Sequence, residues 1–245
     1  MAPDRRTALV AGVLYLVTFL ASIPALLLIA PVLDDPAYVL GDGTDTRVLL
    51  GALLDLVNAA ACVGTAVALY PVIRRHGEAR SLGFVTARMA EAAIIVVGVL
   101  GVLTVVTLRQ DVGGPTAADP ASVQVTATAL VTLRDWTFLL GPGTMAGVNA
   151  LLLGSVLFRA RLVPRLVPAM GLLGAPLILG AAVATFFGLV EQLSVWSALA
   201  TAPIAAWELS LGICLVVKGF RSTTVASTTH DPGTPVVRSD AVPVG

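Results

Sequence analysis

Long apolar runs separated by short polar segments divide this chain into six stretches. The runs cover about residues 8–32, 48–72, 85–108, 136–158, 169–190 and 194–217. Each is long enough for a helix of about 20 residues, which a hydrocarbon core of about 30 Å requires. Only the segment VEQLS separates the fifth run from the sixth. The pattern predicts six transmembrane helices, of which the last two form a tight hairpin.

The segment that precedes the fourth run, residues 122–135, has two interpretations. Its apolar side chains Val123, Leu130 and Leu133 follow helical spacing, while the residues around them are mostly polar. Such a stripe suits a short helix lying in the membrane interface. It equally suits an outward extension of the fourth transmembrane helix, and the sequence leaves both open.

Composition favours a membrane protein over a soluble one. A length of 245 residues alone would suit one or two soluble domains. However, hydrophobic residues make up 57% and charged residues 12% of the chain, and the mean hydropathy is +0.92. A soluble domain carries roughly 25% charged residues. We therefore predict an all-α integral membrane bundle of six transmembrane helices, formed by residues 1–220.

The two ends of the chain differ from this bundle. Arg5 and Arg6 give a basic start like that of a signal peptide, but the run 8–32 is longer than an apolar signal region of 7–15 residues. We therefore expect a retained first helix. Residues 221–245 are rich in Ser, Thr and Pro and have no aromatic residue. That composition predicts a disordered cytoplasmic tail.

The distribution of basic residues predicts the orientation. When the loops are assigned alternately to two sides, one side receives most of the basic residues and the other receives most of the acidic ones. The basic side holds Arg5, Arg6, Arg74, Arg75, Arg80, Arg159, Arg161, Arg165, Lys218, Arg221 and Arg238, against Arg47, Arg109 and Arg134 on the other. Loops rich in Lys and Arg remain in the cytoplasm. Both termini are therefore predicted to be cytoplasmic, and their common side agrees with an even number of spans.

Four polar residues fall at similar depth in the cytoplasmic half of their helices. Arg88 and Glu91 are three residues apart in the third run, so they share one helical face and can pair. At about 1.5 Å per residue, Glu208 in the sixth run and Asn149 in the fourth lie at comparable depth. We predict that Arg88 bridges Glu91 and Glu208, with Asn149 beside them.

A second polar group is expected toward the outer side. Asp55 lies about seven residues into the second run with Asn58 one turn later, and Arg134 and Asp135 begin the fourth run. A contact between Asp55 and Arg134 would neutralise both charges. Ionisable groups inside a membrane are costly and face the bundle interior. They indicate structural pairing, a transport or proton pathway, or a catalytic site with Glu91, Glu208 or Asp135 as acid or base.

Several chemistries lack the residues that they need. The two histidines, His76 and His230, lie in a loop and in the tail, so no buried haem, HExxH zinc site or Ser/His dyad is predicted. Cys62 and Cys214 lie within apolar runs and are expected to pack as free thiols. We predict no metal, no cofactor and no nucleic-acid partner. The partners expected are the lipid bilayer and a small-molecule or lipid ligand, with the oligomeric state open.

Several motifs together resemble one family. They are AGVLYLVTFLASIP, ALYPVIRRH, ARMAEAAI, LRDWTFLLGPG, VNALLLGSVLFRARLVPR and WELSLGICLVVKGF. Over about residues 5–221 the chain resembles the bacterial multi-pass membrane proteins of domain-of-unknown-function family 4386. Arg88 with Glu91, and Arg134 with Asp135, look like part of the family pattern. The resemblance implies a bacterial inner-membrane protein and brings no catalytic residue with it.

Two functional hypotheses follow. The first is a non-enzymatic inner-membrane protein, either an accessory factor or a small-molecule permease, whose polar groups position helices and border a cavity. The second is an intramembrane enzyme that acts on a lipid or lipid-linked substrate. An open pocket beside Arg88 and Glu208 would be compatible with transport or catalysis. A direct ion pair with no adjoining cavity would leave only a structural role for these residues.

Overall fold

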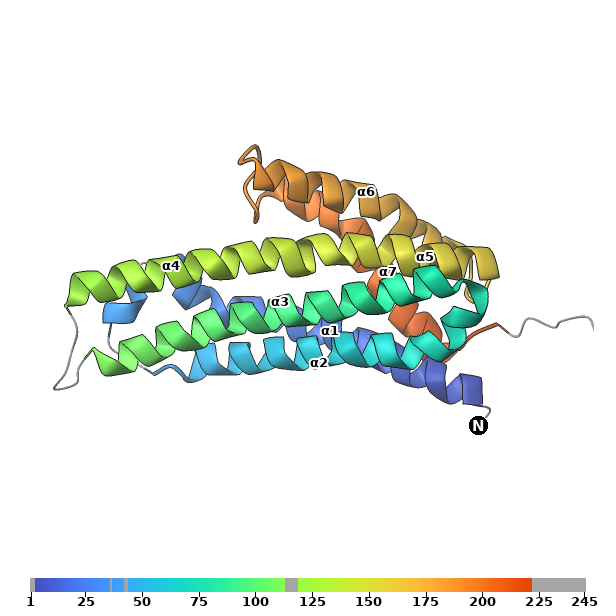
Figure 1. Cartoon of the computed structure of the whole chain (residues 1–245), viewed down its shortest axis with the longest axis horizontal. Coiled ribbons are helices and arrows are strands. Elements are labelled where there is room, and N and C mark those ends of the chain that lie inside the picture. The colour runs from blue at the N-terminus through green and yellow to red at the C-terminus, as the bar shows by residue number, and fades with distance from the viewer. Residues whose placement is uncertain (1–2, 36, 42–43, 113–118, 222–245) are drawn as a thin grey trace, which may run out of the picture.

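The computed structural model describes residues 3–35, 37–41, 44–112 and 119–221, and these form a bundle of long helices with no strand in that part of the chain (Figure 1). Six helices are long and apolar enough to cross a membrane. The elements are α1 (Pro3–Asp34), η1 (Tyr38–Leu40), α2 (Thr46–Ile73), η2 (Arg74–His76), α3 (Glu78–Asp111), α4 (Pro120–Phe138), η3 (Leu139–Met145), α5 (Ala146–Ala160), α6 (Leu166–Phe186) and α7 (Val195–Val217). The all-α architecture is thus confirmed, while residues 222–245 of the predicted tail lie outside the described residues.

The fourth span is one continuous helix of 41 residues, made of α4, η3 and α5. Its N-cap is Asp119, whose carboxylate accepts a hydrogen bond from the Ser122 amide at 3.2 Å, and Pro120 follows as the first helical residue. Residues 122–135 therefore extend the fourth helix, which decides between the two interpretations. Pro142 lies in the wider π-helical turn η3, where the Thr144 hydroxyl donates to the Leu139 carbonyl at 2.8 Å.

The fifth span is shorter than predicted, because α6 ends at Phe186 and not near residue 190. Gly188 adopts a left-handed backbone with φ of 70°. The amides of Gly188 and Leu189 return to the carbonyls of Thr185 and Ala184, both at 2.9 Å. This is the arrangement by which a glycine closes a helix C-terminus. The apolar residues after it belong to the turn before α7, so hydropathy alone misplaced the boundary.

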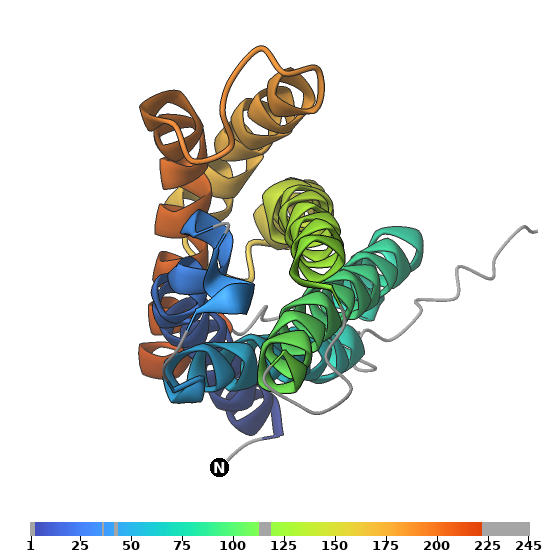
Figure 2. The ribbon, with the colours of Figure 1, turned by 90° about the vertical axis from the view of Figure 1, so that its left-hand side faces the viewer.

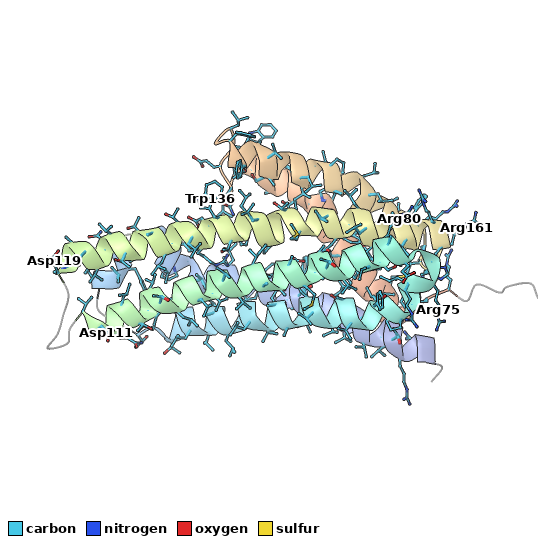
Figure 3. All side chains as sticks on the ribbon, in the orientation of Figure 1. Arg75, Arg80, Asp111, Asp119, Trp136 and Arg161 are labelled. Atoms are coloured by element: carbon cyan, nitrogen blue, oxygen red, sulfur yellow. The ribbon has the colours of Figure 1, made fainter. Side chains whose placement is uncertain are left out.

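Charge is segregated along the bundle. Arg75, Arg80 and Arg161 lie at one end and Asp111 and Asp119 at the other (Figure 3). We call these the basic end and the acidic end. The basic end holds the start of α1, the α2–α3 and α5–α6 turns and the end of α7, as the alternating loop assignment predicts. Which end faces the cytoplasm stays a prediction from that assignment.

The basic half of the bundle is solidly packed. Tyr15, Phe84, Leu153, Trp207 and Leu211 are each less than 2% exposed and belong to one apolar core. Glycines allow close approach here: a Cβ on Gly12 would lie 2.8 Å from the carbonyl oxygen of Gly212, so α1 and α7 pack backbone to backbone. Nothing larger than hydrogen fits at that crossing, which closes this half between its first and last helices.

At the acidic end α3 and α4 extend beyond α6 and α7 (Figure 1). The 34 residues of α3 span about 50 Å, well over a hydrocarbon core of about 30 Å. A polar network joins this end to η1. The Asp45 carboxylate accepts hydrogen bonds from Tyr38 at 2.9 Å and Gln110 at 3.0 Å, and it pairs with Arg109. The Arg109 guanidinium also stacks 4.4 Å from the Tyr38 ring centroid.

This network predicts a pH dependence. Burial opposes the ionisation of Asp45, but the hydrogen bonds from Gln110, Tyr38 and Arg109 outweigh it, so the pKa of Asp45 lies below its ordinary value. A lowered carboxyl pKa adds stability at pH above the unfolded value of about 4, and the gain disappears as pH falls through the folded pKa. Asp45→Asn should therefore melt below the wild type at neutral pH, with the difference shrinking on acidification.

Thermal unfolding of both proteins in detergent across a pH series measures that difference. Asp111→Asn is the matched control, because Asp111 is an exposed carboxylate at the same end. Its melting difference from the wild type should stay small at every pH. A gap for Asp45→Asn that does not narrow in acid contradicts the assignment of the pKa shift to the folded network.

Candidate functional site

A cavity of about 290 Å³ lies in the middle of the bundle and is bordered by residues from every long helix. We call it the central cavity. Most of its wall is apolar, with side chains such as Phe19, Ile95 and Ile204. Its polar and charged lining residues are Thr18, Ser22, Asp55, Asn58, Cys62, Arg88, Glu91, Arg134, Thr201 and Glu208. An apolar cavity with a few convergent polar groups is the usual form of a small-molecule site.

The residues predicted in the cytoplasmic half come together and form the Arg88 cluster (Arg88, Glu91, Asn149 and Glu208), of which all but the fully buried Asn149 line this cavity. Arg88 Nη1 lies 2.8 Å from Glu91 Oε2, and Arg88 Nη2 lies 3.5 Å from Glu208 Oε1. Asn149 Nδ2 donates to the same Glu91 oxygen at 2.8 Å. The guanidinium of Arg88 also lies 5.0 Å from the Tyr15 ring centroid. Both predicted contacts of Arg88 are present, and three helices besides its own contribute.

A second ion pair borders the same cavity nearer the acidic end. Arg134 Nη2 of α4 lies 2.8 Å from Asp55 Oδ2 of α2, and both residues are buried. The α3 helix lies between them, and Gly98 makes the contact feasible. A Cβ on Gly98 would lie 3.0 Å from Arg134 Cδ and 2.5 Å from the Thr137 hydroxyl. Glycine on α3 therefore lets the arginine cross that helix to reach α2.

Asp135 and Asn58 do not join that pair. Asp135 is exposed, since neighbouring helical residues point about 100° apart. Asn58 lies one turn from Asp55, where its side-chain oxygen faces the Cys62 thiol at 3.9 Å, and it borders the central cavity. The four residues predicted as one outer group therefore divide between the cavity wall and the exposed surface of α4.

Asp135 borders a second cavity, also of about 290 Å³, which we call the vestibule. Leu26, Arg134 and Phe138 line both cavities, so they form the partition between the two. The vestibule is further lined by Asp34 at the end of α1 and by Gln192 in the α6–α7 turn. It therefore leads from the acidic half toward the central cavity, whereas the packed core closes the basic half.

The α6–α7 hairpin forms one side of this entrance. From the acidic end the two helices are seen as a pair beside α1 and α4 (Figure 2). Trp136 projects from α4 toward the end of α6, where its ring centroid lies 5.6 Å from that of Phe186 (Figure 3). Gln192 donates to the Asp135 carbonyl at 3.4 Å. Few contacts hold the hairpin turn to α4, in contrast to the dense packing at the basic end.

Comparison with protein families bears on all of these residues. A family model described as "Domain of unknown function (DUF4386)" matches residues 10–219. The chain belongs to this family. The resemblance drawn from its sequence motifs is thereby confirmed. Neither the comparison with curated proteins nor that with solved structures found a match. With six helices long and apolar enough to span a bilayer, this DUF4386 protein is a multi-pass membrane protein.

Sequence reasoning missed part of the site in this DUF4386 protein. It placed the Arg88 cluster and the Asp55–Arg134 pair in separate halves, whereas both border one cavity. It also left out the hydroxyls of Thr18 and Ser22 on α1. A signal for these two was available, because residues four apart in an apolar helix share one face. Among the described residues no group of three His, Cys, Asp or Glu side chains is arranged to hold a metal ion.

Proposed function

We propose that this protein is a permease-like, non-enzymatic protein of the bacterial inner membrane, with a binding site for a small amphipathic molecule in the central cavity. The basic end then faces the cytoplasm, because loops rich in Arg remain on that side. The vestibule opens to the opposite side of the membrane. The ligand enters by the vestibule and passes the partition at Leu26, Arg134 and Phe138.

One observation carries this proposal: the buried charges border an open cavity. Purely structural ion pairs would be enclosed by tight packing, as protein interiors are packed like organic crystals. Here Arg88, Glu208, Asp55 and Arg134 all line a space of about 290 Å³. Intramembrane charges that line a cavity are typical of substrate and ion pathways.

The one-sided access supports a permease over a channel. The core around Tyr15, Phe84 and Trp207 blocks the basic half, while the vestibule adjoins the cavity from the acidic half. Transporters bind substrate near the bilayer midplane and expose it to one side at a time. Glu91 is poorly placed as the acid or base of a catalytic site, because its oxygen nearest Arg88 already accepts from Arg88 and Asn149.

A matched pair of variants tests the proposal. Ala205 lines the central cavity, whereas its neighbour Ala206 is exposed on the outside of α7. Ala205→Phe fills the cavity, and Ala206→Phe adds the same side chain to the lipid-facing surface. We expect a small molecule to co-purify with the wild type and with Ala206→Phe from native membranes, and to be lost from Ala205→Phe. Mass spectrometry of solvent extracts measures it.

Proteoliposomes then separate a permease from a binding protein. The identified compound should enter liposomes that contain the wild type or Ala206→Phe faster than it enters protein-free liposomes. Liposomes that contain Ala205→Phe should take it up no faster than protein-free liposomes do. Equal melting temperatures of the two variants exclude misfolding as the cause. If both variants retain the same extracted compounds as the wild type, the central cavity is not the binding site.

A further inference from the structure

We infer that the ligand of the central cavity is an organic cation, an ammonium compound with a small apolar body, and that Glu208 binds its positive group. This inference rests on the proposed function and names the ligand class for the same site. It follows from the balance of charges around the cavity, from the geometry at Glu208, and from the carboxylates at the entrance.

The charged residues that line the central cavity do not cancel. Asp55 and Arg134 pair at 2.8 Å, and Arg88 and Glu91 pair at 2.8 Å. Glu208 is the fifth charged residue, and its ionised form leaves the cavity with one surplus negative charge. An unbalanced charge away from water is costly unless it is paired. A cationic ligand supplies the missing partner.

The geometry within the Arg88 cluster shows that Glu208 is the available carboxylate. Arg88 lies 2.8 Å from Glu91 but 3.5 Å from Glu208, and Asn149 also donates to Glu91. Glu91 is therefore satisfied by two short contacts, while Glu208 has one long contact. The Glu208 side chain is 17% exposed, against 6% for Glu91, and it lines the cavity. A ligand can reach Glu208 without breaking the Arg88–Glu91 pair.

The vestibule independently favours a cation. Asp34 and Asp135 both line it, and among the described residues neither carboxylate has an ion-pair partner. The guanidinium of Arg134 is directed to Asp55 instead. Arg134 is therefore neutralised by its own partner, and the two carboxylates give the vestibule a surplus negative charge, which concentrates ions of the opposite sign. An anion would be repelled at the entrance and again at Glu208.

The walls define the rest of the ligand. Phe19, Ile23, Ile95, Ile178 and Ile204 surround the polar groups with apolar surface. The volume of about 290 Å³ is at the small end of ligand pockets, which run from about 300 Å³ upward. The site therefore fits one ammonium group with an aromatic or short aliphatic body.

Benzyltrimethylammonium is a suitable probe, with benzyl alcohol as its neutral and phenylacetate as its anionic counterpart. Isothermal titration of the wild-type protein in a neutral detergent should give binding of the ammonium ion at least about tenfold tighter than of the other two, a difference of about 1.4 kcal/mol. Equal binding of benzyl alcohol, preference for phenylacetate, or no binding of the ammonium ion overturns the inference. This comparison needs no variant.

Two carboxylate-to-amide variants locate the interaction. Glu208→Gln keeps the shape but removes the charge and should weaken benzyltrimethylammonium binding about tenfold or more, the scale of one charge-assisted contact. Glu78→Gln is the matched control, because Glu78 is exposed at the basic end and should bind as the wild type does. Unchanged affinity in folded Glu208→Gln also overturns the inference.

Free ammonium compounds and ammonium-bearing lipid headgroups share this chemistry. Displacement of the bound probe by soluble ethanolamine identifies a free cation as the source, and displacement only by phosphatidylethanolamine identifies a headgroup. The experiments distinguish failure of the proposed binding site from failure of the proposed ligand class. If Ala205→Phe alone loses a compound that is neutral or anionic, the binding cavity stands and the cation assignment fails.

Discussion

Arg88→Met is expected to destabilise the protein by about 3–5 kcal/mol, the usual effect of removing one partner from a buried ion pair. The side chain of Arg88 is 2% exposed and faces two carboxylates, those of Glu91 and Glu208. Methionine fills a similar volume but leaves both carboxylates without a cation in the apolar middle of the bundle. The free energy of unfolding, from reversible denaturation in mixed micelles, measures the loss.

A triple variant should recover the stability that Arg88→Met loses. Combining Arg88→Met with Glu91→Gln and Glu208→Gln removes every charge of the Arg88 cluster, and Asn149 can still hydrogen-bond to a glutamine at position 91. Neutralising a whole buried network is often close to neutral in stability. The triple variant should therefore recover most of the loss.

Arg75→Met is the matched control, since Arg75 is exposed at the basic end. Surface substitutions of this kind change stability by no more than about 0.5 kcal/mol. A triple variant as unstable as Arg88→Met, or an Arg88→Met no less stable than Arg75→Met, would mean that charge pairing does not hold this part of the bundle together.

The residue pairs of the Arg88 cluster were predictable because helix geometry is regular. A spacing of three residues places Arg88 and Glu91 on one face, and counting residues from the membrane boundary brings Glu208 and Asn149 to the same depth. Both arguments use only distance along an axis. They succeed wherever the helix is straight and its end is known.

The central cavity was not predictable in this way. A cavity depends on how far each helix is rotated and on which side chains leave space, and neither follows from depth. Gly98 illustrates this, because its missing side chain lets Arg134 cross α3 to Asp55. In the sequence it is one of 23 glycines. Its importance arises only from what packs against it.

Helix ends were the other weak point. Gln124 and several threonines lower the hydropathy of α4, which left open whether residues 122–135 form a separate interfacial helix or extend the fourth span. The cap at Asp119 and the continuous helix that follows it show the extension. At the end of α6 the reverse occurred, because apolar residues continue past Gly188 although the backbone has already turned. Hydropathy reports the surroundings of a residue, whereas caps and glycines decide where a helix begins and ends.

Exchanging the charges of Asp55 and Arg134 should restore stability that either single change removes. Asp55→Arg places two guanidinium groups together, and Arg134→Asp places two carboxylates together, in a pair whose side chains are 7–8% exposed. Each should cost about 3–5 kcal/mol. The double variant re-forms an opposite pair, so its loss should be smaller than the sum of the two single losses by the coupling energy of the pair.

A double-mutant cycle on the free energy of unfolding gives the coupling between the two positions, and residues in one buried pair couple by about 0.5–3 kcal/mol. The control cycle joins Asp55→Arg to Arg109→Asp. Arg109 is an arginine on α3 that pairs with Asp45 at the acidic end, so its reversal should not rescue Asp55→Arg.

Equal rescue by both partners would show that overall charge, and not the contact across Gly98, governs stability. If Arg134→Asp rescues Asp55→Arg and Arg109→Asp does not, the rescued double variant also serves to test the partition. Position 134 then carries the short carboxylate where the long arginine divided the vestibule from the central cavity. Benzyltrimethylammonium should enter that double variant faster than the wild type, because the shorter side chain at position 134 opens the partition.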